Sequence, residues 1–236
     1  MLINRGLDSV DGANTFLNPT RETLHNRSLP DSGAFVERVT RARDRGETVL
    51  VYGDYDVDGT TGTALLLRYL KSIGLNVLYF VPSREGRGYG IHPDILQEAK
   101  EKGVTLAITV DCGSEDVENA FAIQRMGIDL IITDHHPARQ PNAGAFLTIN
   151  PYINGYPFRY VSGAGVAYKL SAECRKSLGG SLDGLLALAS FGTIADVMPL
   201  VDENRALARL GLQELVESVL PSLVALRRHV GLDKDK

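Results

Sequence analysis

The sequence predicts an α/β fold, a doubly wound and mainly parallel sheet flanked by helices. From Thr48 onward, apolar segments of strand length alternate with helical segments, which is the order that βαβ units produce. The first such segment, Thr48–Tyr52, is short, continuous and rich in valine, as is typical of a strand buried on both faces. Acidic residues or histidines follow three of the strands directly. Ligands bind at the carboxyl ends of strands in such sheets, so we expect a site there.

The segment before the first strand is predicted to be mostly irregular. Residues 2–27 are polar and rich in turn-forming residues, with one short helical candidate at Ser9–Phe16. Ala34–Arg45 follows as an amphipathic helix with Phe35 and Val39 on its apolar face. Its arginines lie largely on the other side, which predicts a solvated face, with phosphate contact as the alternative. These are Arg38, Arg41, Arg43 and Arg45.

The first two strands are separated by a helix. Gly59 and Thr60 predict a turn into a helix at Thr61–Ile73, and the apolar run Asn76–Pro82 predicts the second strand. The loop Ser83–His92 holds three glycines and two arginines, a composition that suits a mobile loop near a charged ligand.

The next elements are bounded by glycines. Helix Pro93–Lys102 ends at Gly103 and precedes a third strand, Leu106–Val110. Helix Val117–Met126 ends at Gly127, and the apolar run after it predicts a fourth strand, Ile128–Thr133. The pattern repeats once more in weaker form at Ala145–Ile149.

The last third of the chain is predicted to be helical. The glycine-rich start Ser162–Gly165 opens a helix at Val166–Leu178; such a start exposes N–H groups that favour an anion, although glycines there more often allow close packing. Leu182–Ile194 is apolar throughout, which predicts a buried helix, and Glu203–Val219 is amphipathic. A charged tail, Leu232–Lys236, follows.

Composition indicates a soluble globular chain of one large or two small domains. The chain has 236 residues, 44% hydrophobic and 23% charged, without an apolar run long enough to span a bilayer. Its two cysteines make no disulfide framework, which favours a reducing cytoplasm. The net charge of −4 argues mildly against a nucleic-acid-binding protein, but two bound divalent cations would balance it.

Three aspartates follow the first strand at alternate positions, Asp54, Asp56 and Asp58. Carboxylates this close together repel one another and raise each other's pKa unless a cation neutralises them. A calcium-binding EF-hand is excluded, because Leu65 stands where that loop needs a glutamate and a strand precedes the loop. A solvated acidic turn is the remaining alternative, which the ligand-type residues after later strands disfavour.

Those later residues are Asp111, His135, His136 and Asp196. Carboxylates with imidazoles suit Mn²⁺ or Mg²⁺, and the absence of positioned cysteines argues against structural zinc. Two such ions would serve phosphoester hydrolysis, and neither a Walker A sequence nor a G-x-S-x-G sequence is present.

Five motifs follow one another in the chain: GDYDVDG (Gly53–Gly59), VDCGS (Val110–Ser114), TDHH (Thr133–His136), SGAGVAYKL (Ser162–Leu170) and GTIADVMPL (Gly192–Leu200). Together they resemble the DHH phosphoesterase superfamily, and more narrowly its RecJ-like exonucleases. The resemblance extends over nearly the whole chain and includes NRGL and FLNP near the N-terminus. It implies a 5′→3′ exonuclease that releases nucleotides from single-stranded DNA in repair and recombination, with two Mn²⁺ or Mg²⁺ ions. We expect a cytoplasmic monomer.

The resemblance also implies a role for each site residue. Asp56 would bind one ion and Asp58 the other, and Asp111 would bridge them. His135 and Asp196 would be the remaining ligands of the second ion. The catalytic residues would be Asp111, His135 and His136, with His136 facing the scissile phosphate. Tyr52 stands where the superfamily often has a histidine, so Asp54 or water would complete the coordination of the first ion. The candidates for holding DNA phosphates are Arg84, Arg87, Ser162, Gly163 and Gly165.

By the same resemblance, residues 1–46 form an N-terminal extension and helix, 47–200 a catalytic DHH domain, and 201–236 the start of a connecting helix. RecJ-like proteins continue into a second domain, so we expect a catalytic fragment that binds single strands weakly. Two alternatives remain. One is a DHH phosphoesterase acting on oligoribonucleotides, a cyclic dinucleotide or pyrophosphate. The other is a non-catalytic scaffold module, which the filled metal positions disfavour.

Overall fold

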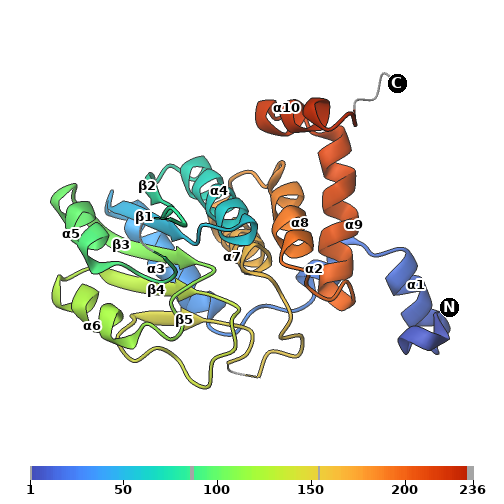
Figure 1. Cartoon of the computed structure of the whole chain (residues 1–236), viewed down its shortest axis with the longest axis horizontal. Coiled ribbons are helices and arrows are strands. Elements are labelled where there is room, and N and C mark those ends of the chain that lie inside the picture. The colour runs from blue at the N-terminus through green and yellow to red at the C-terminus, as the bar shows by residue number, and fades with distance from the viewer. Residues whose placement is uncertain (1, 86–87, 154, 233–236) are drawn as a thin grey trace.

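The computed structural model describes residues 2–85, 88–153 and 155–232. Within them, five parallel strands form one sheet in the order β2-β1-β3-β4-β5 (Figure 1). The predicted doubly wound sheet is therefore confirmed, with strand ends shifted by a few residues. The strands are β1 (Thr48–Gly53), β2 (Asn76–Phe80), β3 (Val104–Val110), β4 (Asp129–Thr133) and β5 (Leu147–Ile149).

Helices cover both faces of the sheet. On one face, α3 (Ser32–Asp44), α4 (Val57–Ser72) and α7 (Gly163–Leu178) pack on a core that contains Val49 and Val51 of β1. On the other face lie α5 (Pro93–Glu101) and α6 (Val117–Arg125), which pack on Leu50 and Tyr52 of the same strand. Successive side chains of a strand point to opposite faces, so a strand buried on both faces must be apolar throughout.

Three further helices form a layer outside α4 and α7. α8 (Leu185–Ala195) packs against α4, α7 and α9 (Asp202–Glu217), and α10 (Pro221–His229) lies across the end of α9 (Figure 1). The predicted helix Glu203–Val219 matches α9, but α10 was not predicted. No helix among the described residues combines the length and the apolar character that a membrane span requires.

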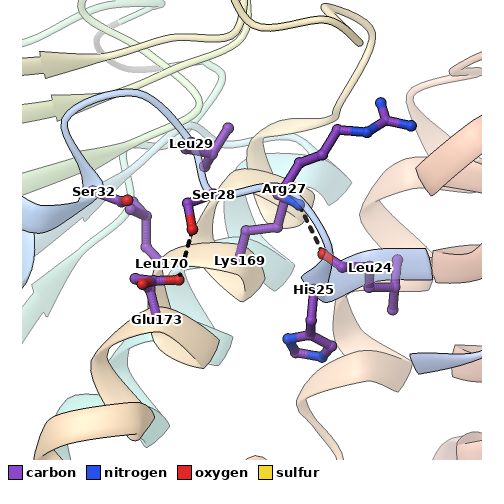
Figure 2. A pocket seen from close by; sticks show the side chains of 9 residues that line it. All are labelled: Leu24, His25, Arg27, Ser28, Leu29, Ser32, Lys169, Leu170 and Glu173. Atoms are coloured by element: carbon purple, nitrogen blue, oxygen red, sulfur yellow. Dashed lines mark hydrogen bonds between the residues drawn. The ribbon is translucent and has the colours of Figure 1, made fainter. Parts of the chain in front are cut away.

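The N-terminal segment is attached to α7. It contains a short 3-10 turn (Ile3–Arg5), α1 (Val10–Leu17) and α2 (Arg21–His25). Figure 2 shows Lys169 of α7 donating a hydrogen bond to the Leu24 carbonyl, at 2.8 Å, and Ser28 donating to Glu173, at 3.2 Å. The pocket between these residues measures ≈ 10 Å³, which is room for about one water molecule. It is therefore a packing gap and not a ligand site.

The start of α4 differs from the prediction. Asp56 is the N-cap, and its carboxylate accepts a hydrogen bond of 2.8 Å from the Gly59 N–H, so the helix begins at Val57 and not at Thr61. A Cβ on Gly59 would meet the backbone of Asp54, so glycine is needed there for close approach and not for a turn. As a consequence, Asp58 lies in the first helical turn.

Arg38 contradicts the prediction of a solvated arginine face. Its side chain is 3% exposed, and it donates hydrogen bonds of 2.7 Å to Asp129 and to Glu47. α3 packs across the amino ends of β1 and β4, where these two acids lie, and a buried guanidinium needs such partners. Arg38 therefore stabilises the fold and is not available for phosphate contact.

Candidate metal centre

The predicted ligand residues converge at the carboxyl ends of β1, β3 and β4. The strand order reverses between β1 and β3, and ligands bind at such switch points. Asp54 follows β1, Asp111 follows β3, and His135 and His136 follow β4, while Asp196 lies at the end of α8. Strands far apart in sequence thus bring the ligand-type side chains to one edge of the sheet.

The side chains form three overlapping groups. Within each group, one ligand atom per residue lies within 4.8 Å of the others. Asp111 and His135 each belong to two groups, so the three groups form a single cluster. They are Asp54, Asp56 and Asp111; Asp58, His135 and Asp196; and Asp111, His135 and His136.

One nitrogen of His135 faces three carboxylates. Its Nε2 lies 3.0 Å from Asp111 Oδ1, 3.5 Å from Asp196 Oδ2 and 3.6 Å from Asp58 Oδ2. The side chains of His135, Asp58 and Asp111 are nearly inaccessible to solvent. Carboxylates gathered this closely are stable only when protons or a bound cation neutralise their charge.

Among the residues that the structure describes, three carboxylate oxygens in this cluster are buried without a hydrogen-bond partner: Asp54 Oδ1, Asp111 Oδ1 and Asp196 Oδ2. Buried polar atoms are rarely left unsatisfied, because they have lost their contacts with water. Carboxylate oxygens with one imidazole are donors that Mn²⁺ and Mg²⁺ accept. The residues present therefore fit divalent cations.

The pKa of Asp111 shows how unfavourable this cluster is without a cation. Burial, and next the nearby carboxylates of Asp58 and Asp56, raise the pKa of Asp111 to about 10. Burial also raises the pKa of Asp54, Asp58 and Asp196. The backbone at Asp111 has φ of 67°, in the left-handed region, where residues other than glycine are uncommon and cluster at functional sites.

The glycine-rich start of α7 binds a carboxylate of the protein itself. The N–H groups of Gly163 and Ala164 donate to Asp58, at 2.6 and 2.9 Å, while the Gly165 N–H donates to the Ser162 hydroxyl, at 3.0 Å. All of these residues are buried. The predicted contact of Ser162, Gly163 and Gly165 with a substrate phosphate is thus replaced by a structural role, in which Asp58 joins α4 to α7.

The structure places Asp54 in the cluster and Tyr52 outside it. The Tyr52 hydroxyl points away from the cluster and donates a hydrogen bond of 3.0 Å to the Gly90 carbonyl, in a buried setting. Asp54 instead lies in one group with Asp56 and Asp111. Asp54, and not Tyr52, therefore belongs to the carboxylate cluster.

Asp134 is a site residue that the sequence analysis did not single out. It is 1% exposed, and its carboxylate accepts hydrogen bonds from the backbone N–H groups of His135 and Ser114 and from Nδ1 of His136, at 2.8 Å. Burial opposes its ionisation, but the hydrogen bond from His136 and those from Ser114 lower its pKa to about 2. The hydrogen bond to Asp134 in turn raises the pKa of His136. A signal was present in the TDHH motif, where Asp134 precedes the histidines.

An open cleft of ≈ 750 Å³ adjoins the cluster. Its lining includes Asp54, Asp56, Arg84, Tyr89 and His136. The guanidinium of Arg84 lies 5.7 Å from the ring centroid of Tyr55, which holds it at the cleft. Arg87, also predicted to bind DNA, lies outside the described residues.

Comparison with known proteins agrees with this geometry. The profile of the DHH family, N-terminal domain, matches residues 48–193. The chain belongs to the DHH family. The matched region begins at β1 and ends in α8, three residues before Asp196, so it contains every other residue of the cluster.

Within the DHH family, the chain is similar to proteins named RecJ. It is 37% identical to the single-stranded-DNA-specific exonuclease RecJ of Bacillus subtilis, over 91% of this chain and 27% of that protein. It is 36% identical to the RecJ of Thermus thermophilus, over 91% of this chain and 32% of that protein. A crystal structure of exonuclease RecJ bound to manganese superposes with a TM-score of 0.80 at 35% identity, covering 87% of this chain and 53% of that one.

The chain therefore spans about a third of the length of the curated relatives. Crystal structures of the T. thermophilus RecJ in complex with Mn²⁺ and with Mg²⁺ share the fold, with TM-scores of 0.76 and 0.70. They cover 93% and 98% of this chain at 31% and 30% identity, and 33% and 29% of those chains.

Proposed function

We propose that this chain is the catalytic domain of a two-metal phosphodiester hydrolase, a RecJ-like exonuclease that removes nucleotides from single-stranded DNA in the 5′→3′ direction. The observation that carries the proposal is the cluster of carboxylates around Asp111 and His135, in which three buried oxygens have no hydrogen-bond partner among the described residues. The similarity to RecJ proteins, some of them bound to Mn²⁺ or Mg²⁺, supports the substrate and the metals.

In this proposal the cluster holds two ions. Asp54 and Asp56 would bind one, Asp58, His135 and Asp196 the other, and Asp111 would bridge them. A bound pair of Mn²⁺ or Mg²⁺ ions would activate water and neutralise charge on the phosphate. Asp56 and Asp58 are fixed for this task by helix N-termini, Asp56 as the N-cap of α4 and Asp58 through the first N–H groups of α7.

His136 is suited to act on the substrate phosphate. Its side chain is 45% exposed and lines the cleft, whereas that of His135 is 6% exposed. Asp134 holds the ring through Nδ1, which favours the protonated, cationic form of His136. A cation there would stabilise negative charge on the phosphate or donate a proton to the leaving oxygen.

The domain limits also remain proposals. The family match to residues 48–193 supports a catalytic unit at 47–200, preceded by an extension at 1–46 and followed by the start of a connecting helix at 201–236. The free and buried thiols of Cys112 and Cys174 support a reducing compartment such as the cytoplasm. We further propose that the chain acts as a monomer.

Digestion of single-stranded DNA labelled at the 5′ or the 3′ end tests the function. With Mn²⁺ we expect shortening from the 5′ end, and with EDTA no shortening, because the carboxylate cluster needs its cations. Shortening from the 3′ end would refute the direction. Faster hydrolysis of a dinucleotide than of an oligonucleotide would favour a small-substrate phosphoesterase. A protein that binds no Mn²⁺ in calorimetry and cleaves neither substrate would be a scaffold.

Arg84→Ala is expected to weaken substrate binding more than turnover. Loss of one charge-assisted hydrogen bond to a phosphate should raise KM about tenfold and leave kcat within about twofold, since Arg84 lies at the cleft wall and outside the cluster. Steady-state kinetics on a 5′-phosphorylated oligonucleotide measures both constants. Arg43→Ala is the matched control, because Arg43 pairs with exposed Asp44 on α3. A drop in kcat as large as the rise in KM would contradict this role.

A further inference from the structure

Three side chains of one loop, two of them exposed and one half-buried, form a stack beside the metal centre. The loop connects β5 to α7, and in it the guanidinium carbon of Arg159 lies 5.5 Å from the ring centroid of Tyr152 and 5.2 Å from that of Tyr160. Arg159 also donates a hydrogen bond of 3.1 Å to the Tyr160 hydroxyl. The same cation therefore contacts two aromatic rings. Tyr152, Arg159 and Tyr160 are called the Tyr–Arg–Tyr stack below.

The stack lies at the surface, although the same loop has buried aromatic residues. Tyr156 and Phe158 are each 6% exposed, whereas Arg159 is exposed and Tyr160 is 38% exposed. Within the described part of the chain, the partners of the Arg159 guanidinium are Tyr160 and Tyr152 and not a carboxylate. Its charge thus remains available to an anion, in a protein whose net charge is −4.

The buried residues of the loop anchor the stack. The Tyr156 hydroxyl donates a hydrogen bond of 2.7 Å to Glu203, which is fully buried and forms an ion pair of 3.0 Å with Lys169. The side chain of Asn204 donates a hydrogen bond of 2.6 Å to the Tyr160 carbonyl. These contacts fix the loop to α7 and α9. A binding surface held in this way loses little conformational entropy when a ligand binds.

Both ends of the loop contact residues of the metal centre. At one end, the side chain of Asn150 donates to the His136 carbonyl, at 2.8 Å, and accepts from the Tyr152 N–H, at 2.9 Å. At the other end, the Gly163 N–H donates to Asp58, at 2.6 Å. Tyr160 precedes Gly163 by three residues, a span of at most about 11 Å. The stack is thus close enough for nucleotides next to a phosphate at the metal centre to reach it.

We infer that the Tyr–Arg–Tyr stack is a binding platform for single-stranded nucleic acid, in which the tyrosine faces receive bases and Arg159 contacts the backbone phosphate. Aromatic faces accept every base, and interleaved cations attract the phosphates, so such a platform serves an enzyme that must tolerate any sequence. The inference deepens the proposed function and rests on it for the nature of the ligand.

Fluorescence anisotropy with a labelled oligothymidine of about 12 nucleotides tests the platform, with EDTA to prevent cleavage. Tyr160→Ala should weaken binding about tenfold without changing the salt dependence, because stacking is lost and no charge is removed. Arg159→Gln should weaken binding and lower the slope of log affinity against log salt by about 1, because one phosphate contact is lost. A purely structural role for the stack would leave that slope unchanged.

Two further variants serve as controls. Tyr160→Phe keeps the ring and should bind within about twofold of the unaltered protein. Tyr79→Ala removes a tyrosine that is 65% exposed on β2, away from the loop, and should change nothing. Thermal melting establishes whether each variant is folded. If Tyr160→Ala is unfolded, Arg159→Gln decides the test.

The outcomes separate this inference from the proposed function. If Tyr160→Ala and Arg159→Gln bind as tightly as the unaltered protein while Mn²⁺-dependent cleavage persists, the platform is refuted and the nuclease stands. If both bind more weakly, the platform is supported even where no cleavage is detected. If the unaltered protein neither binds nor cleaves the oligonucleotide, both proposals fail.

Discussion

Asp111→Asn is expected to lower the rate of DNA hydrolysis by more than about 100-fold and to leave the fold intact. Asp111 links the group of Asp54 and Asp56 to that of His135, so its loss disturbs both halves of the cluster. Asparagine is the appropriate substitute because it has the same shape and tolerates the left-handed backbone at this position, with φ of 67°. Alanine would add backbone strain to the loss of the ligand.

The same variant should be at least as stable as the unaltered protein when no metal is present. Burial and the neighbouring carboxylates raise the pKa of Asp111 from 3.8 to about 10, so folding at neutral pH must add a proton to this group. An amide needs no proton. Adding Mn²⁺ should raise the melting temperature of the unaltered protein and not that of Asp111→Asn. Hydrolysis within tenfold of the unaltered rate, or an undiminished response to Mn²⁺, would show that Asp111 is not a bridging ligand.

Gly192→Ala is expected to damage both the metal centre and the fold. Gly192 lies in α8, and a Cβ there would collide with the Asp58 carboxylate and lie 2.7 Å from the Cβ of Ala164 in α7. Asp58 is held by the N–H groups of Gly163 and Ala164, so it has no room to move without breaking those bonds. We expect a loss of about 1–3 kcal/mol in the free energy of unfolding, and hydrolysis at least about tenfold slower.

Urea unfolding and DNA hydrolysis measure these two effects. Gly33→Ala is the matched control, because Gly33 lies in the first turn of α3 and a Cβ there meets no atom within 4 Å. That change should be neutral or stabilise the protein by up to about 1 kcal/mol, since alanine favours the helix. If Gly192→Ala unfolded at the same urea concentration as the unaltered protein and cleaved DNA at the same rate, the close approach of α8 to Asp58 would matter neither for stability nor for activity.

The regularity of the sheet explains why it was predictable. The central strands β1, β3 and β4 are short and mainly apolar, and the helices that precede β3 and β4 end at Gly103 and Gly127. Parallel strands place their carboxyl ends at one edge, so Asp54, Asp111 and His135 had to lie near one another. These inferences need only local patterns and one topological rule.

The errors have a common cause, which is that long-range partners change the meaning of a local pattern. Arg38 reads as a solvated residue in α3, but Asp129 and Glu47 are brought to it by the packing of the helix on the sheet. The glycines that open α7 read as a phosphate site, but Asp58 from α4 occupies their N–H groups. In both cases a partner comes from a segment far away in the sequence, and the spacing of residues within one helix does not indicate such a partner.

The sequence by itself determined the layered α/β fold, the strand ends that carry the ligands and the kind of ion they suit, because hydrophobic period and residue chemistry are local properties. Only the tertiary structure decided that Asp54 and not Tyr52 joins the cluster, that Asp134 orients His136, and that the Tyr–Arg–Tyr stack stands beside it. Those facts depend on where a side chain points after helices and loops pack. That direction is fixed by burial and hydrogen bonding between segments far apart in the chain.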